Sequence, residues 1–263
     1  MFQSVERDKR TYLLHSKLAS YQKRVDAAIA TARTALALAK NPFLSFSAGK
    51  DSVVLLDIAV KAGFRGDLLF FKYGIFTDVE TPPENTELLK YYAAKHGLKY
   101  HILDCFGEVD CWEQCGRFVL FPETAEEKRI FDRTNRDFAT KSEEFCRQNG
   151  VDLQLIGMRK AESARRKAML NKKGSIYAVQ SRKSLTCCPL ANFSSEDIWS
   201  YIFGNDLKYL SIYDYPYIDR RRNRDEITML YNDALIRHGM IFHYKEMYPK
   251  FFAWIKERWG EVV

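Results

Sequence analysis

The chain has 263 residues, of which 46% are hydrophobic and 14% aromatic, which is enough to bury a sizeable core. It has no apolar run long enough to cross a bilayer, its N-terminus is too charged for a secretory signal, and its six cysteines lack the spacing of a disulfide framework. These features exclude membrane-spanning and disulfide-rich secreted proteins and favour the cytoplasm, while the net charge of +7 suits a polyanionic partner such as a nucleotide or a nucleic acid.

The first forty residues predict helix, because apolar side chains recur at helical spacing and an alanine-rich stretch follows. Asn41-Pro42 ends this helical region. Phe43 to Phe46 is an apolar, aromatic run that predicts a buried strand, and Val53 to Ala59 predicts a buried helix. The sequence therefore predicts a strand, a short turn and a helix in direct succession.

The turn between this strand and this helix predicts an anion-binding site. Gly49 permits a tight turn, and the free N–H groups at the start of a helix attract negative charge. Lys50 adds a cation, and Ser47 and Ser52 add hydroxyl donors. Asp51 would repel a bare phosphate, so we expect a divalent cation, Mg²⁺, to bridge Asp51 to the phosphates.

Strands and helices alternate in the following residues. This alternation predicts an α/β fold, a Rossmann-like parallel sheet with right-handed crossovers and helices on both faces. The expected domains are residues 1–205 and a helical C-terminal extension, residues 206–263, packed on it. The expected later elements are strands over 67–73, 99–104 and 151–157, a helix over 87–92 that closes at Gly97, a charged helix pair over 125–148, and tail helices over 226–238 and 248–259.

Three polar segments follow the carboxyl ends of predicted strands, where parallel sheets bind their ligands. They are Ser47 to Ser52, Tyr73 to Asp78, and the residues from Gly157 onward. We expect them to meet at one crevice. The third segment, Gly157 to Lys167, has five cations and one carboxylate, and arginines grip phosphate oxygens with two donors at once.

The motifs resemble those of a known family. Ser47 to Ser52 resembles the SGGKDS pyrophosphate loop of the N-type ATP pyrophosphatases (PP-loop proteins), with Ala48 in place of one glycine. The residues Gly157, Arg159, Glu162, Ser163 and Arg166 match the G-x-R-x-x-E-S-x-x-R segment of the phosphoadenosine phosphosulfate reductase family. The stretch from Pro189 to Ile202 is similar to a later segment of that family, and it also predicts a serine-capped helix.

This resemblance implies an enzyme that cleaves ATP between its α and β phosphates and adenylates an acceptor oxygen, which sulfur then displaces. It implies ATP and Mg²⁺ as cofactors, with Mg²⁺ near Asp51, and a sulfur-delivery partner such as a cysteine desulfurase. The implied catalytic residues are Lys50, Asp51, Arg159, Arg165 and Arg166. The implied nucleotide-binding residues are Ser45, Phe46, Ser47, Ala48, Gly49, Lys50, Asp51, Ser52, Tyr73, Gly157 and Arg159.

The cysteines bear on the choice between family members. Sulfonucleotide reductases need a nucleophilic cysteine near the C-terminus, and no cysteine follows Cys188, which argues against reductase chemistry. Cys111, Cys115, Cys187 and Cys188 have enough thiolates for an iron–sulfur cluster, but ordinary buried or free thiols are the favoured interpretation.

Size and basic character most resemble the ATP pyrophosphatase of DNA phosphorothioation (the DndC and SspD type), which would make DNA the acceptor. The alternatives are a phosphoadenosine phosphosulfate or adenylylsulfate reductase, an ATP-sulfurylase subunit, and a non-enzymatic module that senses ATP. The Arg220 to Arg224 cluster would contact a phosphate backbone or form an exposed turn. The oligomeric state and the acceptor are not determined by the sequence.

Overall fold

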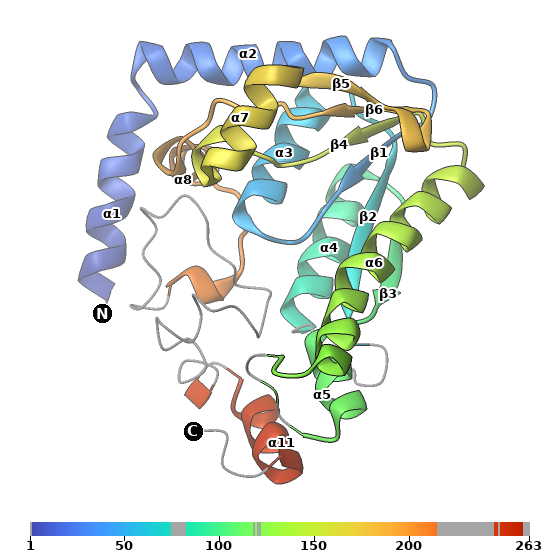
Figure 1. Ribbon diagram of the computed structural model, residues 1–263. Helices are drawn as coiled ribbons and strands as arrows, with labels where there is room; N and C mark the ends of the chain where they lie inside the picture. The colour runs from blue at the N-terminus through green and yellow to red at the C-terminus, as the bar shows by residue number, and fades with distance from the viewer. Residues whose placement is uncertain are drawn as a thin grey trace. The chain divides into compact units, whose positions relative to one another are not determined.

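The computed structural model describes residues 2–74, 83–117, 119, 122–214, 245, 246 and 248–259 (Figure 1). The chain divides into two compact units. The first comprises residues 1–70, 84–101 and 145–225, and the second comprises 71–83, 102–144 and 226–263. Within the described part of the chain, no helix has both the length and the apolar character needed to cross a membrane.

A six-stranded sheet with the strand order β3-β2-β1-β4-β6-β5 is the framework of the fold. β1 pairs in parallel with β2 and β4, and β4 pairs in parallel with β6, whereas β5 is antiparallel to β6. The expected Rossmann-like sheet is confirmed, with two further strands that were not predicted, β6 and the antiparallel edge strand β5. The strands are β1 (Pro42–Ser45), β2 (Asp67–Tyr73), β3 (Tyr100–Cys105), β4 (Leu153–Leu155), β5 (Ile176–Val179) and β6 (Ser184–Cys187).

Helices precede, connect and follow these strands. The α-helices of the described residues are α1 (Phe2–His15), α2 (Ala19–Ala37), α3 (Lys50–Lys61), α4 (Pro83–His96), α5 (Glu108–Cys115), α6 (Ala125–Gln148), α7 (Ala164–Lys173), α8 (Ser195–Gly204) and α11 (Pro249–Trp259). Three short 3₁₀ helices join them, η1 (Lys160–Glu162), η2 (Gln180–Arg182) and η3 (Ser211–Asp214).

Helix α3 forms part of the core of the first unit. Its side chains from Ser52 to Ala59 are all buried, in agreement with the predicted buried helix. The only carboxylate among them, Asp57, accepts a hydrogen bond from the Tyr201 hydroxyl at 2.7 Å and pairs with Lys61 Nζ at 2.8 Å. A buried charge needs such partners, so these contacts fix α3 against α8.

The helical region at the N-terminus is divided into α1 and α2, which are fastened to α8 by Asp197. This carboxylate accepts hydrogen bonds from His15 Nε2 at 2.8 Å and from two nitrogens of Arg24 at 2.8 and 2.7 Å. It also accepts the Ser194 N–H at 2.9 Å, while Ser194 caps α8. The predicted serine-capped helix is confirmed, and its early acid also joins three helices.

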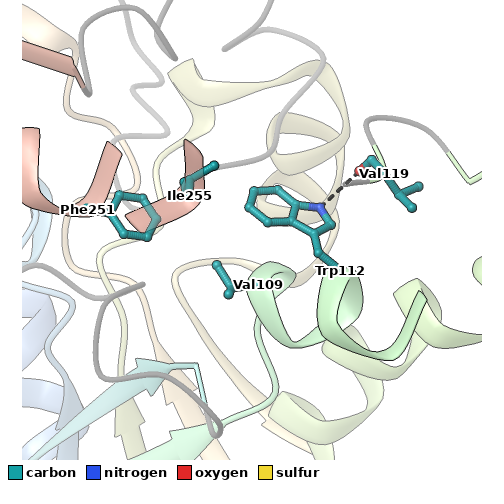
Figure 2. Close-up of a cluster of buried hydrophobic side chains, with 5 residues drawn as sticks. All are labelled: Val109, Trp112, Val119, Phe251 and Ile255. Carbon is teal, nitrogen blue, oxygen red and sulfur yellow. Dashed lines mark hydrogen bonds between the residues drawn. The ribbon is translucent and has the colours of Figure 1, made fainter. Parts of the chain in front are cut away.

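The second unit has its own core, shown in Figure 2. Trp112 of α5 is buried with Val109, Phe251 and Ile255, and its indole N–H donates a hydrogen bond to the carbonyl of Val119 at 3.0 Å. Helix α11 therefore packs on α5 through aromatic and branched aliphatic side chains. The predicted tail helix over residues 248–259 is confirmed as α11.

Some element predictions differ from the structure. Residues 125–148 form the single helix α6 rather than a helix pair, because the segment contains no glycine or proline to interrupt it. Helix α5 was not predicted, although Gly116, with φ of 66°, ends it. The expected helix over 226–238 and the arginines at 220, 221, 222 and 224 lie outside the described residues. The domain boundary after residue 205 stays a prediction.

Candidate nucleotide site

The loop between β1 and α3 turns sharply at Ala48. This residue has φ of 62° and its side chain is fully buried, so the left-handed backbone conformation is occupied by a residue other than glycine. Gly49 is the N-cap residue of α3, and its carbonyl accepts the first hydrogen bond within the helix, from the Val53 N–H, at 3.1 Å. The loop therefore presents the start of α3 at the carboxyl end of β1.

Hydroxyl oxygens accept hydrogen bonds from two of the backbone N–H groups at the start of this helix. The Gly49 N–H lies 3.4 Å from Ser47 Oγ, and the Lys50 N–H donates to the Tyr213 hydroxyl at 3.1 Å. Ser52 Oγ donates to the Gly49 carbonyl at 2.8 Å. These hydroxyl oxygens thus occupy the positions in which the oxygens of a bound anion would accept hydrogen bonds from the first N–H groups of a helix.

A chain of charges connects the loop to the segment after β4. Lys50 Nζ lies 3.4 Å from Asp51 Oδ2, and Asp51 Oδ1 lies 2.7 Å from Arg159 Nε. The side chains of Lys50 and Arg159 are 1% and 0% exposed, whereas that of Asp51 is 22% exposed. Two buried cations therefore converge on one carboxylate at the helix start, as expected for a site that holds an anionic ligand.

Gly157 allows this close approach of the two segments. A methyl group placed on Gly157 would lie 3.4 Å from the backbone and Cβ of Asp51, which leaves little room for a larger side chain. Beyond it, Glu162 accepts the Arg159 N–H at 2.7 Å and forms an ion pair with Arg166. The predicted meeting of the loop with the residues from Gly157 onward is thus observed.

The remaining predicted site residues have other surroundings. Ser45 Oγ accepts a hydrogen bond from Gln154 at 2.9 Å, and the Phe46 ring is buried against Tyr92, with 5.9 Å between centroids. Any contact of Phe46 with a nucleotide would therefore come from its backbone. Arg165 is exposed on the first turn of α7. Tyr73 ends β2 in the second unit, and residues 75–78 lie outside the described part of the chain.

Comparisons with known proteins identify the family of the chain. Residues 41–219, which are more than half of the chain, match the phosphoadenosine phosphosulfate reductase domain. The chain belongs to this family. It is therefore a member of the PP-loop ATP pyrophosphatase superfamily, and nucleotide binding is a property of that class. No curated protein matches the chain.

Three solved structures of low sequence identity resemble the fold. The phosphoadenylyl-sulfate reductase of Candida auris, in a phosphate complex, has 21% identity and a TM-score of 0.52 and covers 72% of this chain and 84% of its own. The NMN synthetase of Francisella tularensis has 10% identity and a TM-score of 0.50, and the match covers 92% of this chain and 97% of the synthetase chain. The U34-tRNA thiolase NcsA of Methanococcus maripaludis, with its [4Fe-4S] cluster, has 12% identity and a TM-score of 0.49, and the match covers 88% of this chain and 77% of the thiolase chain.

The thiols of this family member are poorly suited to nucleophilic chemistry. Cys105, Cys187 and Cys188 are buried, and burial raises the pKa of each thiol to about 12. The half-buried Cys115 also has its pKa raised by burial. Among the residues that the structure describes, no three His, Cys, Asp or Glu side chains gather as metal ligands, which gives no support to a four-thiolate cluster.

The magnesium prediction meets a similar test at Asp51. Mg²⁺ is commonly held by one or two carboxylates together with phosphate oxygens. Both oxygens of Asp51 face cations here, Lys50 and Arg159. In this arrangement Asp51 holds the side chains of Lys50 and Arg159 in place, and a magnesium ion held by the protein stays a prediction.

Tyr213 is a site residue that the sequence did not reveal. It lies in η3, where its ring packs edge-on against Trp199 with 5.2 Å between centroids, and Lys50 Nζ lies 5.7 Å from its ring centre. The ring and the hydroxyl thus contact both the charge and the backbone of Lys50. Because Tyr213 is 163 residues from Lys50 in sequence, no local pattern pointed to this contact.

Proposed function

We propose that the chain is an ATP pyrophosphatase that cleaves ATP between its α and β phosphates and transfers AMP to an acceptor oxygen. The convergence of Lys50 and Arg159 on Asp51 at the start of α3 carries this proposal. Negative charge accumulates on the departing pyrophosphate during such a reaction, and buried cations held in place beforehand stabilise it most. Arg165 and Arg166 would add charge from the start of α7.

In the proposed reaction, an acceptor oxygen forms a bond to the α-phosphorus, and the bond from that phosphorus to the oxygen bridging the β-phosphate breaks. Pyrophosphate leaves with the electron pair, and the acceptor remains as an AMP ester. The helix-start N–H groups and the hydroxyls of Ser47 and Ser52 would hold the pyrophosphate, displacing the contacts that these groups make with one another. Mg²⁺ bound to ATP would neutralise part of the phosphate charge.

The state of the thiols favours this chemistry over sulfonucleotide reduction. A reductase of this kind requires a thiolate nucleophile, and burial raises the pKa of Cys105, Cys187 and Cys188 to about 12. We therefore propose that a partner, a cysteine desulfurase or another sulfur-delivery protein, supplies the sulfur. The acceptor that we propose is an oxygen of the DNA backbone, as in phosphorothioate modification. The sulfur bonds to the backbone phosphorus that carries the adenylated oxygen, and AMP leaves together with that oxygen. Where the partner carries the sulfur as a persulfide, a second thiol reduces it and leaves the partner as a disulfide.

Release of pyrophosphate from ATP and Mg²⁺ tests the proposal, measured alone, with sulfate and with duplex DNA. We expect release by the wild type, stimulated by DNA, and a decrease of roughly 100-fold or more in Lys50→Met, since a preorganised charge contributes about that much. Lys90→Met, at an exposed lysine of α4, is the matched control and should retain the activity.

The outcomes separate the alternatives. Stimulation by sulfate instead of DNA would replace the proposed acceptor with sulfate. ATP binding without pyrophosphate release under all three conditions would contradict an enzymatic function. A decrease of activity in Lys90→Met equal to that in Lys50→Met would contradict the assignment of Lys50. Thermal unfolding of both variants at the wild-type temperature shows that neither substitution disturbs the fold.

A further inference from the structure

The net charge of the chain is concentrated in one short segment. Residues 160–183 contain eight lysines and arginines and a single carboxylate, Glu162. The whole chain has 41 basic and 34 acidic side chains, so 33 of each remain outside this segment. The excess of +7 therefore belongs to residues 160–183, and the rest of the chain is neutral in sum.

This segment forms one continuous stretch of the first unit, from η1 through α7 and β5 to η2. Helix α7 is held by Leu170, which is buried with Cys188 and Ala191 and has Tyr177 of β5 packed against the same cluster. The opposite side of α7 is exposed, and β5 is an edge strand of the sheet. We call residues 160–183 the basic segment; its exposed cations are Arg165, Lys167, Lys172, Lys173 and Lys183.

Most of these cations have no carboxylate partner among the residues that the structure describes. Arg166 pairs with Glu162, and Arg182 donates to Gln154 and to Thr186. Lys173 lies over the Tyr177 ring, with 5.0 Å from Nζ to the centroid, an arrangement that leaves its charge in place. Within the described ranges, the five exposed cations have no carboxylate within 4.0 Å. The basic segment therefore presents charge that attracts a polyanion.

We propose that the basic segment binds the phosphate backbone of duplex DNA and presents it to the nucleotide site; this rests on the proposed function. Duplex DNA has about one negative charge for each 1.7 Å of its axis, and a ten-residue helix such as α7 is about 15 Å long. The segment begins at Lys160, directly after Arg159 of the nucleotide site. A backbone held along α7 would therefore bring an acceptor oxygen toward the bound ATP.

Binding of a labelled DNA duplex, measured by fluorescence anisotropy without ATP, tests this surface. The variant replaces Lys167, Lys172, Lys173 and Lys183 with glutamine, none of which belongs to the nucleotide site. The matched control replaces four exposed lysines elsewhere in the first unit, Lys17, Lys23, Lys90 and Lys99, and removes the same total charge.

We expect the basic-segment variant to bind DNA about tenfold more weakly or worse, with the salt slope reduced by about 0.9 for each phosphate that the variant no longer neutralises. The control should bind like the wild type. Equal weakening in both variants would show that only total charge matters and would overturn the proposal, as would a wild type that fails to bind DNA. Tighter binding of an RNA duplex of the same sequence would overturn the assignment of DNA.

This measurement is independent of catalysis. A wild type that binds DNA through the basic segment but never releases pyrophosphate would contradict the proposed function and leave this surface standing. Release of pyrophosphate stimulated equally by DNA in the wild type and the basic-segment variant would contradict the surface and leave the proposed function standing. Equal melting temperatures of both variants and the wild type establish that the substitutions leave the fold intact.

Discussion

Ala48 holds the loop of the nucleotide site in a conformation that alanine disfavours. Its φ of 62° places the residue in the left-handed region, and its side chain is completely buried. A residue other than glycine in this region has a strain of order 1 kcal/mol or more. Because alanine carries only one methyl group beyond Cα, this strain is smaller for alanine than for a β-branched side chain.

Two substitutions at Ala48 should therefore differ clearly in their effect on stability. We expect Ala48→Gly to change the free energy of unfolding by less than about 1 kcal/mol, because relief of strain offsets the greater freedom of glycine in the unfolded chain. We expect Ala48→Val to destabilise by about 3 kcal/mol, because a branched side chain adds both backbone strain and overpacking. Urea unfolding measures both values, and equal stability of the two variants would contradict the strained conformation.

The contacts of individual residues explain which parts of the site were predictable. Lys50, Asp51 and Gly157 stand in short motifs, and their meeting follows from the rule that ligands bind at the carboxyl ends of parallel strands. The contact of Tyr213 with Lys50 follows from no such rule, because it depends on how a distant 3₁₀ helix packs. The roles of Arg165 and Tyr73 stay predictions.

Helix α8 is joined to two other helices through a single side chain, that of Asp197. Asp197 is 1% exposed; burial raises its pKa, but hydrogen bonds from Arg24, the Ser194 N–H and His15 outweigh burial and leave the pKa below its usual value. These bonds join α1, α2 and α8. An ionised Asp197 therefore stabilises the packing of three helices.

We expect Asp197→Asn to lower the free energy of unfolding by about 2–3 kcal/mol at pH 7, since the substitution removes bonds to a charged acceptor. Because the pKa of Asp197 is lower in the folded protein than in the unfolded chain, its ionised form adds to the free energy of unfolding. This stabilisation is complete above the usual pKa of about 3.9 and is lost as the pH falls through the pKa of the folded protein. The difference from the wild type should thus shrink below about pH 4. Glu196→Gln, an exposed neighbour, is the control; a difference that stays constant down to pH 2 would contradict the ionised state.

The length and residue pattern of each element explain why some elements were predicted and others were not. The strongly apolar strands β1 and β2 and the buried helix α3 have patterns that match their burial. Strands β5 and β6 have four residues each and are stabilised by pairing with β4 and with each other, so their own sequences contain little signal. Helix α6 was divided in the prediction because its high charge was interpreted as two exposed helices.

For the whole molecule, the relation between the two compact units determines how ligand binding affects stability. Strands β2 and β3 each run from one unit into the other, at residues 70–71 and 101–102. Separate unfolding of either unit would break both strands within their length. We therefore expect the chain to unfold in one cooperative transition.

The proposed pyrophosphate site lies in the first unit, whereas three of the four tryptophans, Trp112, Trp254 and Trp259, lie in the second. At about 100 times its Kd, pyrophosphate should stabilise the folded state by about 2.7 kcal/mol, which corresponds to roughly 5–10 °C in Tm for a chain of this size. If the units unfold together, tryptophan fluorescence and circular dichroism must report the same shift, and Lys50→Met must remove it. A fluorescence transition that stays in place while the circular dichroism transition moves would show that the second unit unfolds independently of the nucleotide site.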